Sequence, residues 1–518
     1  MPIRFSLRPL PLALSLTLLL GGCSLIPPFS LPGFDTSASY REEIAPATAE
    51  LPWKHAANES AVLVQQAPWE VFELPELSAL LARLETANAN LAVARARYNQ
   101  AAALIDQASA GLFPAVNGNA GTTRARSGQT SPTTSNSLGL AASWEIDLWG
   151  RLRADVEVNK ASALASAADL AGVRLALQAQ LVQALLSLRI VEVQRQLLDA
   201  SVADYERYVQ LTVDRVRFGV ASRADLAQAE TQLLSAQAQA IETGVQRSQL
   251  EHAIAVLVGE LPANFSLPVR PAGEATLRAP LRGLGDAPGG AREPLPGSGT
   301  THADIFDQVP ALPAVPLSAP STLLERRPDI AAAEKRAVAA NAQVGVARAA
   351  FFPVLSLTGS AGGRSSLWAD ILSAPASFWS IGPALVAPLF DAGLRSAQKA
   401  QAVAAWEIAS ATYRQTVLSA FQEVEDQLAA LRILADEARV QDEAVKAARV
   451  GAELTLAQYR AGIASSLQVI VTNSALLSAE RAALDLHNRR LTAAVVLIRA
   501  LGGGWQGAAE VAPAASDS

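Results

Sequence analysis

Val216-Arg-Phe-Gly-Val-Ala-Ser222 and Tyr459-Arg-Ala-Gly-Ile-Ala-Ser465 are two versions of one segment, separated by an ungapped offset of 243 residues. The same offset aligns Leu233-Leu-Ser-Ala236 with Leu476-Leu-Ser-Ala479. Similarity of a chain to itself at a fixed offset is the signature of an internal repeat. The sequence therefore predicts two tandem copies of one large unit, which we place at 76–259 and 322–505.

Each copy contains a proline-free stretch that is far longer than a helix of an ordinary globular domain, at 152–216 and 394–458. Apolar residues in the first stretch recur at intervals of 3 and 4, which is the spacing of a coiled-coil seam. At 1.5 Å per residue, such a helix is about 98 Å long. The paired Gly219 and Gly462 predict where the long helices end, because glycine readily takes the left-handed conformation that closes a helix.

A second, shorter helix is predicted to return after each glycine, at 223–258 and 466–501. In the second copy its seam includes polar residues as well as apolar ones: Leu467, Ile470, Ser474, Leu477, Arg481, Leu484, Asn488, Leu491, Val495 and Ile498. Each copy is thus expected to end in a helical hairpin, so that the fold is mainly α with a small β part.

The β part is predicted as a pair of strands in each copy, at about 115–147 and 354–389. In the first pair, apolar residues alternate with polar or small ones; the apolar set is Leu138, Leu140, Ala142, Trp144 and Ile146. Alternation of this kind is typical of a transmembrane barrel, although a strand of a soluble sandwich shows it too. On the polar face, Gly139 is expected to accept substitution by a polar residue.

Four tryptophans lie in or beside these strands, namely Trp144, Trp149, Trp368 and Trp379. They predict an aromatic girdle at the membrane interface, and ordinary core packing is the alternative. Four strands are too few to close a barrel, and an open edge cannot lie in lipid because its backbone groups have no partners. The barrel must therefore be shared between chains: two copies give a filled barrel of eight strands, and three give twelve strands around water.

The N-terminus has the layout of an export signal, with Arg4 and Arg8 before an apolar run, and 1–22 is the predicted signal peptide. Leu20-Gly-Gly-Cys23 resembles a bacterial lipobox, which predicts that Cys23 carries lipid. The alternative is an ordinary signal followed by an idle buried cysteine. Residues 23–75 are then a lipid-anchored tether.

Two further regions are predicted to lie outside the repeats. Residues 260–321 are rich in proline and glycine without a period and form the linker between the copies, and 506–518 form a flexible tail.

Composition and motifs exclude several classes of function. One cysteine and four scattered histidines cannot build a zinc site of the usual spacing, and a net charge of −6 argues against nucleic acid as a partner. A lipid-anchored periplasmic hydrolase would need a nucleophile motif or a metal or phosphate motif, and the sequence contains none of the usual ones. No enzymatic activity, metal or cofactor is expected.

Six further segments, taken in order along the chain, carry a resemblance to a known family. They are Asp147-Leu-Trp-Gly150, Gln228-Ala-Glu-Thr-Gln-Leu233, Glu325-Arg-Arg-Pro-Asp-Ile330, Ala340-Asn-Ala-Gln-Val-Gly345, Ala347-Arg-Ala-Ala-Phe-Phe-Pro353 and Ala500-Leu-Gly-Gly-Gly-Trp505. Together they resemble the outer membrane factor family, the TolC-like exit ducts of tripartite efflux pumps, in its lipoprotein branch.

The resemblance implies a homotrimer in the cell outer membrane, lipid-anchored and membrane-spanning, with a large periplasmic part. Its twelve-stranded barrel would continue into a periplasmic α-barrel whose closed tip opens when a periplasmic adaptor (membrane fusion) protein and an inner-membrane RND-type transporter engage it. The expected function is passive export of drugs or other toxic small molecules through this gated duct. A periplasmic coiled-coil adaptor or scaffold lipoprotein without a pore is the alternative, although alternating strands do not suit it.

This sequence departs from the family in two places. Extra residues lie around 275–303, and Gln468-Val-Ile-Val471 stands where many relatives carry Asp-Val-Leu-Asp. A gate is therefore expected at Gln468 and Val471, closed by amide and apolar contacts. Asp225 is the carboxylate that could still supply an acidic ring, with a helix N-terminal charge as its alternative role.

The repeated turns are the candidate docking site for the adaptor, with simple helix-ending turns as the alternative. The residues are Arg217, Phe218, Gly219, Val220, Tyr459, Arg460, Gly462 and Ile463.

Overall fold

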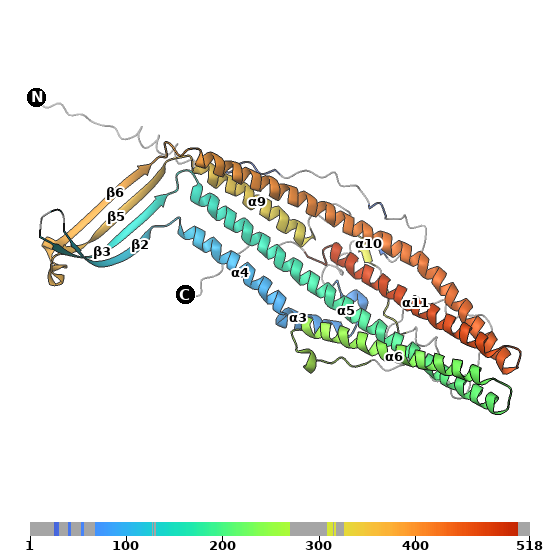
Figure 1. Ribbon diagram of the computed structural model, residues 1–518. Helices are drawn as coiled ribbons and strands as arrows, with labels where there is room; N and C mark the ends of the chain where they lie inside the picture. The colour runs from blue at the N-terminus through green and yellow to red at the C-terminus, as the bar shows by residue number, and fades with distance from the viewer. Residues whose placement is uncertain are drawn as a thin grey trace, which may run out of the picture.

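The computed structural model describes residues 25–30, 40–42, 53–55, 68–126, 128, 131–269, 308–313, 315–317 and 326–505. Cys23, the predicted signal peptide, the extra linker residues at 275–303 and the predicted tail lie outside these residues. The molecule is elongated, with four long strands at one end and two helical hairpins at the other (Figure 1).

Three helices of the first repeat have counterparts in the second, and the short first helix of the first repeat has none among the described residues. The first repeat contains α3 (Leu77–Ala87), α4 (Ala89–Ala110), α5 (Arg151–Arg217) and α6 (Arg223–Leu257). The second contains α9 (Pro328–Ala349), α10 (Leu394–Arg460) and α11 (Ser466–Ala500). The bounds of the long and returning helices lie within two residues of those expected from the sequence.

The first helical stretch of the first repeat is broken at Asn88, which the sequence pattern did not indicate. The Asn88 side-chain oxygen accepts a hydrogen bond from the Leu91 amide at 3.0 Å and caps α4. Its side-chain amide donates to the Leu257 carbonyl at 2.8 Å, at the end of α6. One buried side chain thus starts one helix and completes another.

The main core lies between the helices of the two repeats. Helix α5 contacts α4, α6, α9 and α11, and α10 contacts α9 and α11. Fully buried leucines and valines recur along the seams that the sequence predicted, among them Leu181, Leu188, Leu491 and Val495. Leu467 was wrongly expected in the seam: it is 51% exposed, and its neighbour Ser466 is buried instead.

The four long strands form one antiparallel sheet in the order β2-β3-β5-β6. Their bounds are β2 Ala115–Ala125, β3 Thr133–Ile146, β5 Val354–Ser365 and β6 Ser377–Val386. A separate parallel pair joins β1 (Trp53–His55) to β4 (Val315–Leu317), so the described end of the linker pairs with the described part of the tether.

Register gives the sheet one apolar and one polar face. Leu140 pairs with Ala361 and Trp144 with Leu357, and the apolar set continues across the next strand. These residues share a face because side chains on directly paired positions point the same way. The full apolar set is Val116, Ala120, Leu138, Leu140, Ala142, Trp144, Ile146, Leu355, Leu357, Ala361, Trp379, Ile381, Pro383 and Leu385.

The opposite face is polar, and Ser360 and Ser380 lie on it with their hydroxyl oxygens 2.8 Å apart. Gly139 also lies there, but the expectation that it would accept a polar side chain is wrong. A Cβ at Gly139 would lie 2.9 Å from the Ala361 carbonyl oxygen, because Gly139 pairs directly with Gly362 and the two strands approach closely.

The tryptophans do not form one girdle. Trp368 and Trp379 are exposed, whereas Trp149 is half-buried and stacks on Phe352 with ring centroids 4.8 Å apart. The Trp149 indole also donates to the Pro353 carbonyl at 2.7 Å. Trp149 therefore joins the first repeat to the second at the base of the sheet.

Among the described elements, the same two sides of the chain have no neighbouring element from the sheet to the hairpins. Contacts run in the order α4-α5-α9-α10 near the sheet and α6-α5-α11-α10 near the hairpins, below the strand order β2-β3-β5-β6. The first repeat thus supplies one edge, through β2, α4 and α6. The second repeat supplies the other, through β6 and α10 (Figure 1).

Candidate functional site

The two helical hairpins end in turns of identical hydrogen bonding. The Gly219 amide donates to the Val216 carbonyl at 3.0 Å, and the Val220 amide donates to the Arg215 carbonyl at 2.8 Å. Gly462 and Ile463 make the equivalent bonds at 3.0 and 2.9 Å. This is the Schellman motif, and both glycines have the positive φ that it requires, +75° and +78°.

Most of the candidate docking residues lie on the outside of these turns. Phe218, Val220 and Ile463 are exposed, at 77%, 70% and 78%. Arg217 and Arg460 are exposed beside them. Tyr459 differs, because only 2% of it is exposed and it belongs to a small core inside the tip with Tyr208, Ala229, Val469 and Ile470.

Each returning helix begins with a reciprocal capping box. The Ser222 hydroxyl accepts from the Asp225 amide at 3.1 Å, and the Asp225 carboxylate accepts from the Ser222 amide at 2.9 Å. Ser465 and Gln468 form the same box in the second repeat. Two of the three candidate gate residues are thus helix caps, whereas Val471 is exposed one turn further on.

Asp225 also connects the two hairpins. The Ser466 hydroxyl at the start of α11 donates to the other oxygen of the Asp225 carboxylate at 2.6 Å. The hydrogen bonds from Ser466 and then from Ser222 hold the pKa of Asp225 below its ordinary value, because they stabilise the charged form. Both carboxylate oxygens are therefore occupied within the chain.

A group of aromatic and basic side chains makes a second connection at the same level. The Arg215 guanidinium lies 4.2 Å from the centre of the Tyr459 ring and donates to the Tyr459 carbonyl at 3.2 Å. The Tyr208 hydroxyl donates to the Ser466 carbonyl at 3.1 Å. Burial, and then the neighbouring Tyr459, raise the pKa of Tyr208 to about 12, so its hydroxyl keeps its proton.

Above the tip, the two repeats meet through a ladder of polar contacts spaced seven residues apart on α11. The Ser474 and Tyr205 hydroxyls lie 3.4 Å apart, and Arg481 donates to the Gln239 side chain at 2.6 Å. Asn488 accepts from the Ser187 hydroxyl at 3.2 Å. These are the polar seam positions of the sequence pattern, and a cavity of about 530 Å³ lies beside the lower two.

The seam becomes apolar beyond Asn488. Leu491, Val495 and Ile498 are all buried in the main core. The hairpins are thus joined by a dry, close-packed contact towards the sheet, by single hydrogen bonds along the ladder, and by the small core inside the tip.

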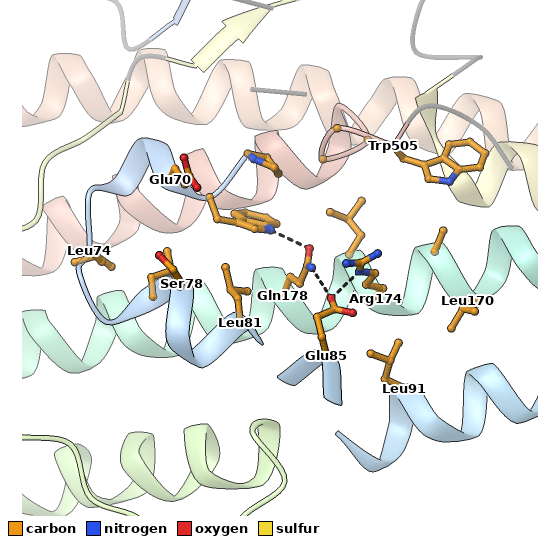
Figure 2. A pocket seen from close by; sticks show the side chains of 18 of the residues that line it. Glu70, Leu74, Ser78, Leu81, Glu85, Leu91, Leu170, Arg174, Gln178 and Trp505 are labelled. Atoms are coloured by element: carbon orange, nitrogen blue, oxygen red, sulfur yellow. Dashed lines mark hydrogen bonds and ion pairs between the residues drawn. The ribbon is translucent and has the colours of Figure 1, made fainter. Parts of the chain in front are cut away.

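A larger cavity, of about 1050 Å³, lies beside α3 and α5 next to Trp505 (Figure 2). Glu85 in its wall accepts from Arg174 at 2.6 Å and from Gln178 at 2.8 Å, and Gln178 accepts from the Trp69 indole at 3.0 Å. These bonds fasten α3 and the segment before it to α5. Among the described residues, no three His, Cys, Asp or Glu side chains gather as metal ligands would.

Comparison with known proteins agrees with this architecture. A family model described as outer membrane efflux protein matches residues 80–260 and 319–503, which is more than half of the chain and follows its two repeats. The chain belongs to the outer membrane efflux protein family. The expected membership is confirmed, and the family is one of channels rather than enzymes.

Curated relatives match over most of their length. The pyoverdine export outer membrane protein OpmQ of Pseudomonas aeruginosa is 32% identical over 452 residues, covering 85% of this chain and 87% of the relative. The probable efflux pump outer membrane protein TtgC of Pseudomonas putida is 31% identical over 498 residues, covering 94% of each.

Solved structures share the fold. The outer-membrane channel OprN matches with a TM-score of 0.78 at 29% identity, covering 93% of this chain and 100% of that one. The open state of the Neisseria gonorrhoeae MtrE outer membrane channel matches with a TM-score of 0.75 at 25% identity, covering 93% and 98%. This efflux protein is therefore mainly helical with a small strand part, and its location is the outer membrane.

Sequence reasoning found the turns and the caps of this site but missed the contacts between the hairpins. Arg215 and Tyr208 lie at ordinary helical positions, and each contacts a residue about 250 positions away. The polar seam positions Ser474, Arg481 and Asn488 were the one available signal, since polar groups in a seam need partners.

Proposed function

We propose that three copies of this chain form the gated exit duct of a tripartite efflux pump, through which small organic molecules pass passively from the periplasm to the exterior. The observation that supports this most is the pair of open edges. A sheet with free edges in lipid leaves backbone groups without partners, and joining β6 of one chain to β2 of the next removes both edges.

The helices support the same head-to-tail ring. Exposed apolar residues on α6 recur at helical spacing at Leu234, Ile241 and Val245, and those on α10 do so at Ile433, Val440 and Leu454. Within the part of the chain that the structure describes, each stripe lacks a partner, and it would find one in the next copy. Three copies give twelve strands, a size that leaves water inside, whereas two give a filled barrel.

The tip supports a role as the gate. Asp225, Arg215 and Tyr208 hold the two hairpins of one chain together around the small tip core, and the rungs of the polar ladder above them are single hydrogen bonds that can part. We propose that the resting duct is closed at this level, and that Val471 lies at a constriction that repels water. Because both oxygens of Asp225 are occupied, an acidic ring is not the main closing element.

The outer surface of the tip supports docking of a periplasmic adaptor that connects the duct to an inner-membrane RND-type transporter. Each chain presents two turns of the same shape with exposed apolar side chains, so a trimer would present six in a near-sixfold ring. Asp at Gly462 would strain the turn and add charge beside Ile463. Gly462→Asp should abolish co-purification of the adaptor from cross-linked membranes while the trimer remains.

The mass of the detergent-solubilised protein and its conductance in planar bilayers test the duct. A trimer mass with single-channel currents is expected. A mass near that of one chain, or a trimer that conducts no current under any condition, would favour the scaffold lipoprotein instead. Incorporation of labelled palmitate tests the proposed lipidation of Cys23, and Cys23→Ser should abolish it without changing the fold.

A further inference from the structure

The described parts of the N-terminal tether are docked on the second repeat. The backbone amides of Arg41 and Glu42 donate to the two oxygens of the Glu425 carboxylate at 2.8 and 3.1 Å. Arg432 then donates to the Glu42 side chain at 2.7 Å. Tyr40, just before them, is buried in the main core. This part of the tether is therefore fixed along α10.

A second contact, on α9, lies closer to the N-terminus. The side-chain amide of Asn341, itself 4% exposed, donates to the Pro27 carbonyl at 2.9 Å. Gly345, one helical turn further on, contacts Ile26 so closely that a Cβ there would lie 2.8 Å from its Cγ1 and 3.0 Å from its Cα. We call Asn341 and Gly345 the α9 seat, because only glycine leaves room for Ile26.

The seat directs the chain towards the sheet. Pro27 contacts Asn341, and the preceding residue, Ile26, contacts Gly345, one turn nearer the end of α9. The chain therefore approaches the start of β5 as it runs back towards its N-terminus, because β5 begins shortly after α9 ends. Ile26 follows Cys23 by three positions, and an extended chain of that length covers at most about 10 Å. Cys23 can therefore reach the level where helices give way to strands.

That level has the character of a membrane boundary. Exposed apolar side chains gather at the bases of all four strands, where the sheet meets the helices: Phe113, Leu148, Phe351, Leu389 and Phe390. Exposed apolar groups at one level of a spanning protein are stable where lipid covers them. We call this set the basal belt.

We propose that the α9 seat holds the mature N-terminus so that acyl chains on Cys23 enter the membrane at the basal belt, which brings the lipid anchor and the strands to the same depth. The inference rests on the proposed lipidation of Cys23. When the α9 seat holds the tether, the acylated Cys23 keeps the sheet at the membrane depth where strands of neighbouring copies must pair. An anchor on a released tether leaves that depth undefined and slows pairing.

Gly345→Ala tests the seat, because its methyl group displaces Ile26. Gly172→Ala is the matched control: Gly172 lies inside α5, a helix that belongs to neither open edge, and a Cβ there would make only an ordinary contact, 3.8 Å from the Pro328 Cβ. Both substitutions raise helix propensity equally. Since Cys23 is the single cysteine, a Ser30→Cys variant that is acylated has one free thiol, which a nitroxide label can report.

In full-length protein in liposomes, the label should be several-fold more mobile with Gly345→Ala than with Gly172→Ala. Equal mobility would overturn the seat, whatever the channel conducts. Two labels per chain instead of one would mean that Cys23 is not acylated, which would count against the proposed lipidation rather than against the contact on α9.

A pulse-chase assay of trimer formation tests the coupling to lipid. Gly345→Ala should slow the appearance of detergent-stable trimers several-fold, and Gly172→Ala should not. In a Cys23→Ser background, Gly345→Ala should add nothing, because an unlipidated N-terminus has no anchor to position. A slowing of equal size in both backgrounds would overturn the proposal, since the seat would then act on folding alone.

Discussion

Single side chains at the tip each serve two helices, which makes the connection between the hairpins depend on few groups. Asp225 is the clearest case, since one carboxylate oxygen caps α6 and the other accepts from α11. Its lowered pKa follows from these bonds. Stabilisation by a carboxylate of this kind is present above its ordinary pKa and is lost as pH falls through the lowered value.

Closure of the tip should therefore be independent of pH between about 5 and 8, far above the range in which Asp225 titrates. Asp225→Asn leaves one acceptor oxygen for two bonds and should cost about 1 kcal/mol, seen as a higher resting conductance in planar bilayers at every pH in that range. Glu242→Gln, the same carboxylate-to-amide change at an exposed position on the same helix, is the control. Unchanged resting current in Asp225→Asn would show that this contact does not hold the gate.

Trivalent cations distinguish an apolar gate from an acidic one. Wild-type channels should show only weak block from the periplasmic side, because Asp225 is occupied and Gln468 and Val471 carry no charge. Val471→Asp should create micromolar block and raise the resting leak, since it places like charges around one axis. Micromolar block of the wild-type channel that disappears in Asp225→Asn would contradict this account.

His487 gives the molecule a pH response away from the tip. Its ring nitrogen lies 2.7 Å from the Pro310 carbonyl, and burial lowers its pKa to about 4. Below about pH 6.5, the histidine of the unfolded chain binds a proton that the histidine of the folded chain does not bind. The free energy of unfolding therefore decreases as the pH is lowered, by up to about 1.4 kcal/mol per pH unit between 6.5 and 4.

Hydrogen exchange of residues 308–313 should accordingly quicken as pH falls from 7 to 5, after correction for the intrinsic pH dependence. His487→Gln should remove most of that change, because an amide cannot gain the proton. Protection that falls equally in both proteins would assign the effect to another group.

At the scale of helices and strands, periodicity and paired glycines suffice to place the long helices, their ends and the two faces of the sheet. They fail where a contact joins distant residues. The break at Asn88 depends on the hydrogen bond from its side chain to Leu257, at the end of α6. The burial of Ser466 in place of Leu467 depends on the hydrogen bonds of Ser466 with Tyr208 and Asp225 in the first repeat. Gly139 depends on a neighbouring strand, and the α9 seat lies 314 residues from Pro27.

The two faces of the sheet should respond differently to charge. Leu140→Arg, on the apolar face, should cost about 2–4 kcal/mol if lipid covers that face near its middle. Ser143→Arg, three residues along on the polar face, should cost much less. Urea unfolding of the protein in liposomes measures both, and equal costs would mean that lipid does not cover the apolar face.

The polar ladder should behave as a seam that opens. Replacing Ser474 by Val and Arg481 by Leu exchanges single hydrogen bonds for apolar contact beside the cavity, so the hairpins should stay closed. Efflux in a strain that depends on this channel should fall while trimer yield holds. Leu491→Ile, in the part of the seam that is already apolar, is the control. Normal efflux in the double variant would show that the ladder need not part.

At the scale of the whole molecule, each chain is an incomplete wall whose two edges differ. A contact between different edges joins copies head to tail, and such a contact closes into a ring only when the rotation per copy divides a full turn. The open edges run through the strands and the helices alike, so a single rotation has to satisfy both layers.

Charge placed on one edge should disrupt the ring without unfolding the chain. Val440→Glu on α10 or Ile241→Glu on α6 should each shift the detergent-corrected mass from trimer towards monomer, because each buries an unpaired carboxylate between copies. Circular dichroism should show unchanged helix content. Glu443→Gln, exposed on α10, serves as control. A trimer that tolerates both glutamates would place the contacts between copies elsewhere.

Because the seam along α11 changes from apolar near the sheet to polar near the tip, the hairpins can tilt about its apolar end. From Asn488 to Ser466 the helix is about 33 Å long, so tilting it by about 10° at the upper end moves the lower end by about 6 Å. That displacement exceeds the reach of every hydrogen bond at the tip, while the packing around Leu491 scarcely shifts. If an adaptor grips the turns as proposed, it pulls on the end of α11 that lies farthest from the close-packed seam, where each degree of tilt produces the largest displacement.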